Sequence, residues 1–428
     1  MMTSGRSDSG DKVDWGRLAL RGGTPVRTDP FPSVANASGR TLGVEEAEAV
    51  ARVLRSGMLC SVWGSEARAL EREFAAMYDV PHAIACSSGT AALHLAVGAV
   101  DPDPGDEIIT SPLTDFGTII PILRQNAVPV FADVDPATGI LDPASVEKQI
   151  SERTRAILVV HLFGIPAPMA DFQALARDHG LVLIEDCAQA LLAEPEPGRY
   201  AGTYGDIGCF SLQQTKHITT GDGGLVITRD DALARRMRLF ADKGWPRDTG
   251  ERTNLFLAAN YRMTELQAAV GRAQLTKLPD VVARRRRTAQ ALTDRIGPLT
   301  GLNPPALPGS VYWQYPIVID PEAAGGSNAT WVEALAAEGI PASAGYLHRP
   351  LYFTPVLAEG RTYGRSRFPL TSPPARKEWT YGPGLCPEAE RLIDETLVVI
   401  GWNENYTVAD IDDITAGIRK VRAGLTRP

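Results

Sequence analysis

The sequence LVLIEDCAQ at residues 181–189, with DIGCFSLQQTK at residues 206–216, decides the fold. In the first stretch a short apolar run ends in two adjacent carboxylates, and such a run predicts a buried strand. Open α/β sheets bind their ligands beyond the carboxyl ends of their strands. The position of Asp186 therefore predicts a ligand site at that edge of a sheet.

Further apolar runs surround this strand and alternate with segments of helical composition. The apolar runs are residues 82–86, 107–110, 128–133 and 156–161, and the helical segments are residues 91–100, 116–125, 145–150 and 169–179. Alternating strands and helices require crossover connections, which produce a mainly parallel sheet covered on both faces. A loop instead of a helix separates residues 208–212 from 225–228, so we expect an antiparallel strand there.

A second, smaller unit follows the sheet. Helical segments continue from Asp231 into an arginine-rich region, and the Pro and Gly residues of 304–309 predict a linker turn. A strand pattern at 311–319 and a helix around 330–338 come next. We therefore expect a disordered N-terminal segment (1–17), a large domain (18–280) and a small C-terminal α+β domain (281–428).

The composition excludes several classes of function. The chain has 428 residues and a formal net charge of −8, so no excess of Lys and Arg is available to neutralise nucleic acid or an anionic membrane. No segment is apolar enough to span a bilayer. No HxH, HExxH or GxxxxGK spacing occurs, which argues against metal and nucleotide-triphosphate sites. The basic run Arg284–Arg287 predicts a solvated helix face rather than a binding patch.

The cysteines indicate a reducing compartment. They are five in number and scattered without CxxC spacing, and several lie inside apolar stretches. This pattern is typical of reduced thiols, and the first fourteen residues lack the apolar stretch of a signal peptide. We therefore expect a cytoplasmic protein.

A lysine and an acid in the quoted stretches point to pyridoxal-phosphate (PLP) chemistry. Lys216 stands in a loop rich in Ser, Thr and Gly, with no other Lys or Arg beside it. Desolvation there lowers the pKa of a lysine, which makes the free amine available as a Schiff-base former and proton carrier. Asp186 suits the acid that keeps the pyridine nitrogen of PLP protonated.

The phosphate of PLP is expected at the loop Ser87-Ser88-Gly89-Thr90, between a predicted strand and a predicted helix. Free backbone N–H groups at a helix N-terminus bind phosphate. Gly89 permits close approach of the backbone, and Thr90 adds a hydroxyl donor. Ser211, five positions before Lys216, can donate from the neighbouring strand.

Each of these residues alone has an ordinary structural interpretation. A Ser-Gly-Thr sequence before a helix is a common N-cap, a lone aspartate after a strand can cap a turn, and a lone lysine is usually a solvated charge. His217 fits a hydrogen-bonded loop histidine as well as a substrate contact. The prediction therefore depends on the order and spacing of the whole set.

With these motifs the sequence resembles the DegT/DnrJ/EryC1/StrS aminotransferases, fold-type I PLP enzymes that act mainly on keto-sugars and keto-cyclitols. The resemblance extends from Leu18 to about Lys277, and more weakly to the end. Its further motifs are Leu20-Arg21-Gly22-Gly23-Thr24-Pro25, Gly221-Asp222-Gly223-Gly224 and Asn260-Tyr261-Arg262-Met263. It implies an α/β fold: a large domain with a mainly parallel seven-stranded sheet flanked by helices, and a smaller C-terminal α+β domain.

The resemblance also implies roles for individual residues. Lys216 matches the Schiff-base lysine, Asp186 the partner of the pyridine nitrogen, and Gln189 the glutamine near the phenolic oxygen of the ring. Gly89, Thr90 and Ser211 match phosphate ligands of the family, and Asn260 matches an asparagine that reaches the phosphate from a neighbouring subunit; Ser88, in the same loop, is a further candidate cofactor contact. The last residue implies a homodimer with shared active sites.

Two positions depart from the family pattern. Most members have a Thr-aromatic pair that places a ring against PLP, but here Asp115 follows Thr114 and Phe116 comes one step later. Either Phe116 stacks on PLP through a shifted backbone, or the ring face is covered differently, so Asp115 and Phe116 are both candidate cofactor contacts. Leu191 stands where a histidine is usual.

The expected reaction moves an amino group from glutamate or glutamine to a keto-cyclitol or keto-sugar in secondary-metabolite biosynthesis. The dehydratases of the family have a histidine where this chain has Lys216, which favours transamination. The Gln213-Gln214 pair resembles that of keto-cyclitol aminotransferases, and the segments Tyr346-Leu347-His348-Arg349 and Gly244-Trp245-Pro246-Arg247 contain candidate substrate contacts. Two alternatives stay open: a PLP enzyme of another reaction type, and a non-catalytic PLP-binding regulatory protein.

Overall fold

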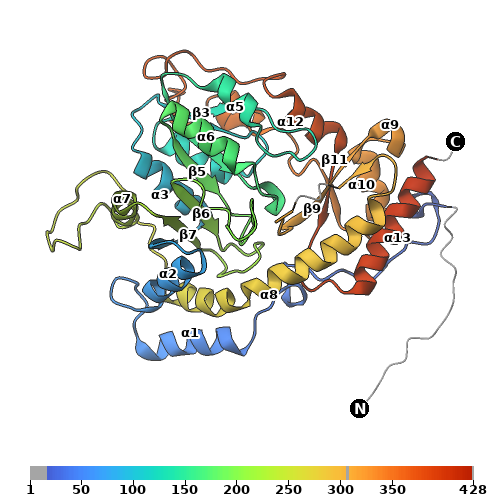
Figure 1. The fold of residues 1–428 in the computed structure, drawn as a ribbon, viewed down its shortest axis with the longest axis horizontal. Helices are drawn as coiled ribbons and strands as arrows, with labels where there is room; N and C mark the ends of the chain where they lie inside the picture. The colour runs from blue at the N-terminus through green and yellow to red at the C-terminus, as the bar shows by residue number, and fades with distance from the viewer. Residues whose placement is uncertain (1–16, 305–307, 427–428) are drawn as a thin grey trace.

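The computed structural model describes residues 17–304 and 308–426. Figure 1 shows a large sheet with helices on both faces, a smaller sheet beside it, and the long helix α8 (Glu265–Ile296) running along both. The predicted disordered segment 1–17 lies, apart from Arg17, outside the described residues. No helix in the described part of the chain combines the length and the apolar character that a bilayer crossing requires.

Seven strands form the large sheet, in the order β1-β7-β6-β5-β4-β2-β3. They are β1 (His82–Cys86), β2 (Glu107–Thr110), β3 (Val128–Phe131), β4 (Thr154–Val160), β5 (Val182–Asp186), β6 (Ile207–Ser211) and β7 (Gly224–Thr228). Strands β2 to β6 pair in parallel, whereas β7 is antiparallel to both of its neighbours. The structure thus confirms the mainly parallel sheet and the antiparallel strand after the loop.

Helices cover both faces of this sheet (Figure 1). They are α2 (Glu66–Met77), α3 (Gly89–Val100), α4 (Ile120–Arg124), α5 (Pro143–Gln149), α6 (Met169–His179) and α7 (Asp231–Ala241), while α1 (Val44–Ser56) packs on α8. Helix α3 is apolar all round and is buried over residues 91–99, which is typical of a helix enclosed by other elements. Its N-terminus therefore stays fixed at the carboxyl end of β1.

The C-terminal part builds a four-stranded antiparallel sheet in the order β10-β11-β9-β8. Its strands are β8 (Leu302–Asn303), β9 (Gln314–Ile319), β10 (Ala342–Ala344) and β11 (Leu397–Gly401), and its helices are α9 (Pro321–Ala324), α10 (Asn328–Ala337), α11 (Pro355–Ala358), α12 (Pro387–Arg391) and α13 (Val408–Leu425). Short 3₁₀ or π turns are η1 (Ala19–Arg21), η2 (Ala37–Gly39), η3 (Phe116–Thr118), η4 (Leu162–Gly164), η5 (Leu351–Phe353) and η6 (Leu392–Thr396).

The two parts of the chain share core packing. Residue 281, the predicted start of the small domain, falls inside α8. Side chains between Leu351 and Val399 belong to the same apolar cluster as the large sheet. The Tyr381 hydroxyl donates to the Pro129 carbonyl at 2.8 Å, which covers the edge strand β3. The division into residues 18–280 and 281–428 therefore stays a proposal.

One prediction for α8 is wrong. Arg285, in the basic run predicted to be a solvated face, is fully buried and forms an ion pair of 2.6 Å with Glu404. It also donates to the carbonyls of Tyr312 and Trp313. Because α8 runs along the large sheet and the C-terminal part, the face that carries Arg285 packs against the C-terminal part, where a buried charge needs a partner.

Candidate active site

A cavity of about 290 Å³ lies at the carboxyl ends of β1, β5 and β6. Its wall combines residues from distant parts of the sequence, from the loop after β1 to Tyr346. Eight of the ten residues predicted for the site line it: Ser88, Gly89, Thr90, Asp115, Asp186, Gln189, Ser211 and Lys216. The other two, Phe116 and Asn260, do not belong to its wall.

Asp186, the last residue of β5, is buried at the base of the cavity. Its Oδ2 accepts a hydrogen bond from the Thr118 hydroxyl at 3.0 Å, and its Oδ1 accepts one from the Ala188 N–H at 3.1 Å. Burial raises the pKa of the Asp186 carboxyl, although both hydrogen bonds and the charge of Lys216 oppose that shift. The described residues offer this carboxylate no ion pair, so it has room for a cationic partner.

Lys216 lies in the turn after β6. Burial lowers the pKa of its amine to about 8, against the opposing pull of Asp186 and Asp115. Its Nζ lies 4.3 Å from the centroid of the Trp313 ring, and the Trp313 indole N–H donates to the Thr215 carbonyl at 2.8 Å. The Lys216 amine therefore has a substantial neutral fraction near pH 8, as its desolvated sequence context predicts.

The N-terminus of α3 forms one end of the cavity. The Ser88 hydroxyl caps it by accepting a hydrogen bond from the Ala91 N–H at 3.0 Å. A Cβ on Gly89 would lie 2.6 Å from Ser211 Cβ, so only glycine lets the helix end approach β6 this closely. The Thr90 hydroxyl has no hydrogen-bond partner among the described residues. Backbone N–H groups, Thr90 and Ser211 together suit an anion.

Gln189 is fixed in the cavity wall by two hydrogen bonds. Its Oε1 accepts from the Phe163 N–H at 2.7 Å, and its Nε2 donates to the Tyr346 hydroxyl oxygen at 3.1 Å. Tyr346 comes from the C-terminal segment in which the sequence predicted substrate contacts. Its ring packs edge-on against Trp313, with ring centroids 6.0 Å apart. The C-terminal part thus completes one wall of the site.

Other candidate residues lie elsewhere. Phe116 begins η3 and packs against the main core, because Asp115 caps this turn through the Gly117 N–H. Asn260 and Arg349 are exposed outside the cavity. The structural interpretation of His217 holds: the ring is fully buried and hydrogen-bonded to the Val311 carbonyl at 3.0 Å.

Sequence reasoning missed two groups in the cavity wall, Thr118 and Trp313. The turn that Asp115 caps places the Thr118 hydroxyl beside Asp186. No local sequence pattern predicted this turn. Trp313 adjoins the predicted strand at residues 311–319, but its place beside Lys216 depends on packing between the two parts of the chain. The Arg40 guanidinium, also missed, donates to the Lys216 carbonyl at 2.9 Å.

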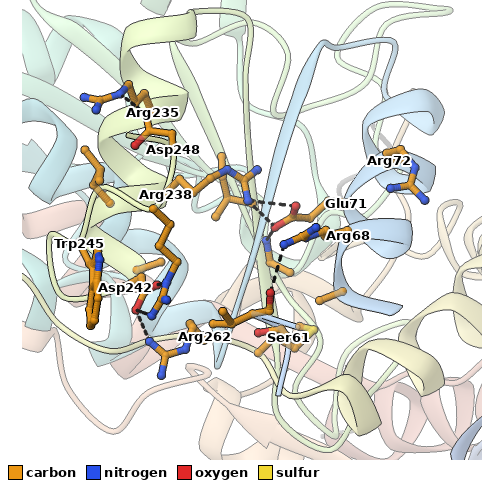
Figure 2. Close-up of a pocket in the computed structure, with 18 residues that line it drawn as sticks. Ser61, Arg68, Glu71, Arg72, Arg235, Arg238, Asp242, Trp245, Asp248 and Arg262 are labelled. Atoms are coloured by element: carbon orange, nitrogen blue, oxygen red, sulfur yellow. Dashed lines mark hydrogen bonds and ion pairs between the residues drawn. The ribbon is translucent and has the colours of Figure 1, made fainter. Parts of the chain in front are cut away.

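A larger cavity of about 510 Å³ lies between α2, α7 and the segment around Arg262. Figure 2 shows arginines paired with carboxylates in it: Arg238 with Glu71 and Arg235 with Asp248. Asp242 also binds Arg262, and Arg247 as well. Among the described residues its wall contains no lysine, so this cavity lacks the amine that a Schiff base with PLP requires.

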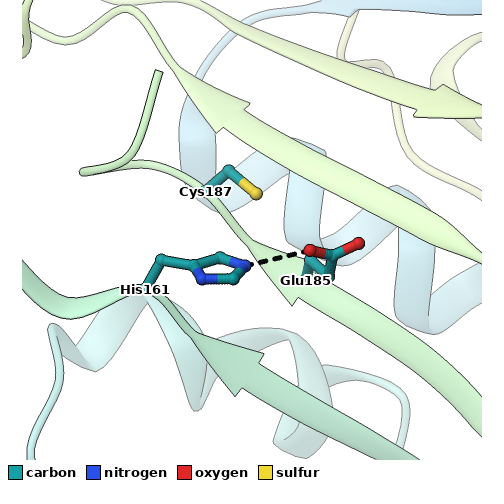
Figure 3. Close-up of side chains that lie close together, drawn as sticks. All are labelled: His161, Glu185 and Cys187. Carbon is teal, nitrogen blue, oxygen red and sulfur yellow. Dashed lines mark hydrogen bonds and ion pairs between the residues drawn. The ribbon is translucent and has the colours of Figure 1, made fainter. Parts of the chain in front are cut away.

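A buried cluster of His161, Glu185 and Cys187 has the residue types of a metal site (Figure 3). His161 Nδ1 accepts from the Ala167 N–H at 3.0 Å, so its Nε2 carries the hydrogen and donates to Glu185 at 3.0 Å. Glu185 also accepts backbone N–H donors, from Gly202, Tyr204 and Gly205. Both ring nitrogens of His161 and the Glu185 carboxylate are therefore engaged in hydrogen bonds within the protein. These hydrogen bonds fix the end of β5 next to Asp186.

The groups of the first cavity fit PLP. A buried acid without an ion pair suits the pyridine nitrogen, a desolvated lysine suits the aldehyde, and the glycine-lined helix end suits the phosphate. The seven-stranded sheet and this set of groups define the class of fold-type I PLP-dependent enzymes.

Comparison with known proteins gives the family. The profile of the DegT/DnrJ/EryC1/StrS aminotransferase family matches residues 40–395. The chain belongs to this family and is a PLP-dependent aminotransferase.

Individual relatives agree with this assignment. An L-glutamine:2-deoxy-scyllo-inosose aminotransferase of Streptoalloteichus tenebrarius is 40% identical and covers 94% of this chain and 97% of its own. A UDP-N-acetyl-3-dehydro-alpha-D-glucosamine 3-aminotransferase of Acidithiobacillus ferrooxidans is 42% identical, over 53% of this chain and 61% of its own. The crystal structure of an aminotransferase from Psychrobacter cryohalolentis superposes with a TM-score of 0.79 at 30% identity, covering 94% of this chain and 100% of its own.

Proposed function

We propose that this enzyme transfers the amino group of glutamine to the ketone of a keto-cyclitol or keto-sugar in an aminoglycoside-type pathway, with Lys216 as the catalytic residue. The observation that carries the proposal is the placement of a desolvated lysine and a buried acid in one cavity. The printed name of the Streptoalloteichus tenebrarius relative supports glutamine as donor and a cyclitol as acceptor.

PLP, when bound, supplies an electron sink that stabilises negative charge beside the nitrogen of the amino group. Asp186, oriented by Thr118 and Ala188, holds a proton on the pyridine nitrogen. The neutral amine of Lys216 would hold the aldehyde carbon of PLP, and its Nζ would carry the proton that moves during amino transfer.

The remaining groups hold the cofactor in place. The N-terminus of α3, with Thr90 and Ser211, binds the phosphate, and Ser88 fixes that helix end. Gln189 has an amide hydrogen left for the phenolic oxygen of the ring after its bond to Tyr346. Trp313 and Tyr346 exclude water from the side of Lys216 that faces the C-terminal part.

We further propose that the enzyme acts as a homodimer in which Asn260 contacts the cofactor of the partner subunit. Asn260 is exposed and lies outside its own cavity. Large apolar side chains are exposed on the loops that border the arginine-lined cavity, including Trp63 at 75% and Leu257 at 97%. Exposed apolar side chains of this size, gathered on neighbouring loops, are typical of an interface. The mass in sedimentation equilibrium tests the dimer.

The five cysteines are all unpaired, and four of them are buried. Free thiols suit a reducing compartment, which supports the proposed cytoplasmic location.

The visible absorbance of the bound cofactor tests the aminotransferase function. Addition of glutamine to the holoenzyme is expected to bleach the band, and addition of the keto-acceptor is expected to restore it. A PLP enzyme of another reaction type or a regulatory PLP-binding protein would keep its band in glutamine. Loss of bleaching with every amino donor tried would contradict the proposal.

A further inference from the structure

The charges in the cavity wall restrict the class of substrate. Among the described residues the wall contains one basic side chain, Lys216, and three carboxylates, Asp115, Asp186 and Asp222. The phosphate of the cofactor adds further negative charge. A nucleotide-linked sugar brings a diphosphate, which proteins bind with arginine, lysine or a metal ion. Within the described residues, the wall that one subunit contributes offers no such group beyond the lysine reserved for the cofactor, so this wall favours an uncharged acceptor.

Asp115 is held in a fixed orientation at the open side of the cavity. Its Oδ1 accepts a hydrogen bond from the Gly117 N–H at 2.7 Å, two residues further on. The side chain is exposed to solvent, and its Oδ2 has no hydrogen bond within the described chain. Asp115 therefore presents a preorganised acceptor whose orientation is set before a ligand arrives.

Gln213 is held by the same kind of local bond. Its Oε1 accepts from the N–H of Thr215 at 2.7 Å and from the Thr215 hydroxyl at 2.8 Å. The amide orientation is thereby fixed, and Nε2, which has no partner in the described part of the chain, is the free group. Gln213 lines the same cavity as Asp115. The pair thus offers one acceptor and one donor, each anchored to its own backbone turn.

We propose that Asp115 and Gln213 select an uncharged, polyhydroxylated keto-ring as amino acceptor. Asp115 Oδ2 accepts a hydrogen bond from one ring hydroxyl, and Gln213 Nε2 donates to another. A hydroxyl group both donates and accepts, so an anchored acceptor and an anchored donor suit a polyol ring. The inference rests on the aminotransferase function proposed above and specifies the substrate class of that site.

Two isosteric variants reverse the hydrogen-bond character of the pair. Asp115→Asn can keep its bond to the Gly117 N–H but places a donor where Oδ2 was, and Gln213→Glu keeps the bonds to Thr215 but places an acceptor where Nε2 was. Glu152→Gln, which removes an exposed carboxylate outside this cavity, is the matched control.

The binding probes are myo-inositol, as an unreactive cyclitol, and UDP-N-acetylglucosamine, each titrated calorimetrically into the holoenzyme. We expect myo-inositol to bind the wild type more tightly than the nucleotide sugar does. Each cavity variant is expected to weaken myo-inositol binding roughly tenfold, because a mismatched polar group stays unpaired. Single-turnover amination of scyllo-inosose should slow in parallel, by a larger factor than the rate of bleaching by glutamine does.

The outcomes separate this inference from the proposed function. Equal myo-inositol affinity in the wild type and both cavity variants, or tighter binding of the nucleotide sugar, overturns the inference even if glutamine bleaches the cofactor. Absence of bleaching in the wild type contradicts the aminotransferase proposal, whereas the inositol titration still reports on polyol recognition. If Asp115→Asn loses the cofactor, judged by absorbance, Gln213→Glu decides the result alone.

Discussion

Lys216 Nζ lies 4.3 Å from the centre of the Trp313 ring, so a side chain of the C-terminal part covers the amine at the edge of the large sheet. The ring excludes water from the amine, and desolvation is the main cause of its lowered pKa. The attraction between a cation and an aromatic ring opposes that effect but is small beside the cost of desolvating the charge.

Replacement of Trp313 should shift the pH dependence of cofactor attachment. Only the neutral amine attacks the aldehyde, so the attachment rate should rise with pH through the pKa of about 8 and then level off. Trp313→Ala admits water, which moves the lysine pKa upward towards its ordinary value, and the midpoint should move to higher pH. The rate of absorbance gain after PLP is added to apoprotein measures this. Trp313→Phe, which keeps a ring, is the control, and an unshifted midpoint in Trp313→Ala refutes the role of the ring.

Asp186→Asn should abolish most of the activity while leaving the fold intact. An amide cannot hold a proton on the pyridine nitrogen, and loss of such acid–base assistance costs roughly two orders of magnitude or more in rate. The measurement is the single-turnover rate of bleaching by glutamine. Thr118→Val, which removes one of the two hydrogen bonds to Asp186, should give a smaller loss of roughly tenfold. Equal rates in Asp186→Asn and wild type would remove Asp186 from the mechanism.

Gly89→Ala should weaken PLP binding. The added Cβ would lie 2.6 Å from Ser211 Cβ and 2.8 Å from Ser211 Oγ, so the end of α3 must move away from β6. We expect the dissociation constant for PLP to rise roughly tenfold or more, since the phosphate contacts depend on that approach. Titration of apoprotein with PLP by fluorescence measures it. Gly382→Ala, where an added Cβ would meet no atom within 4 Å, is the control for a glycine change away from the site.

The buried pair of Arg285 and Glu404 should dominate the stability of the contact between α8 and the C-terminal part. Arg285→Met leaves Glu404 buried without its charged partner, which costs roughly 3–5 kcal/mol. The thermal midpoint should fall markedly, and the double variant Arg285→Met/Glu404→Gln should recover part of the loss. A double variant less stable than Arg285→Met would argue against an unpaired charge as the cause.

Local sequence patterns predicted much of the sheet and its ligand edge. The end of β5 at Asp186 was predictable because buried parallel strands are continuous apolar runs bounded by polar residues. Lys216 was predictable only together with the other motifs, because a lone lysine is usually a solvated charge and the order and spacing of the whole set single it out.

Features that depend on packing between distant segments were not predictable. The helical pattern around Arg285 is that of a solvated face, and only the arrangement of two sheets along α8 explains its burial. Trp313 and Tyr346 reach the cavity through the tertiary structure of the C-terminal part. The orientation of Phe116 depends on a turn that the Asp115 carboxylate caps. This turn places the Phe116 side chain against the core.

Borohydride reduction of the holoenzyme, followed by proteolysis and mass spectrometry, tests the central claim most directly. Reduction makes the bond between an amine and PLP permanent, so the modified peptide identifies the amine. We expect one cofactor per chain, on the peptide that contains Lys216, and none on the Lys216→Ala variant. A cofactor attached to a different lysine, or none attached in protein that shows the PLP absorbance, would contradict it.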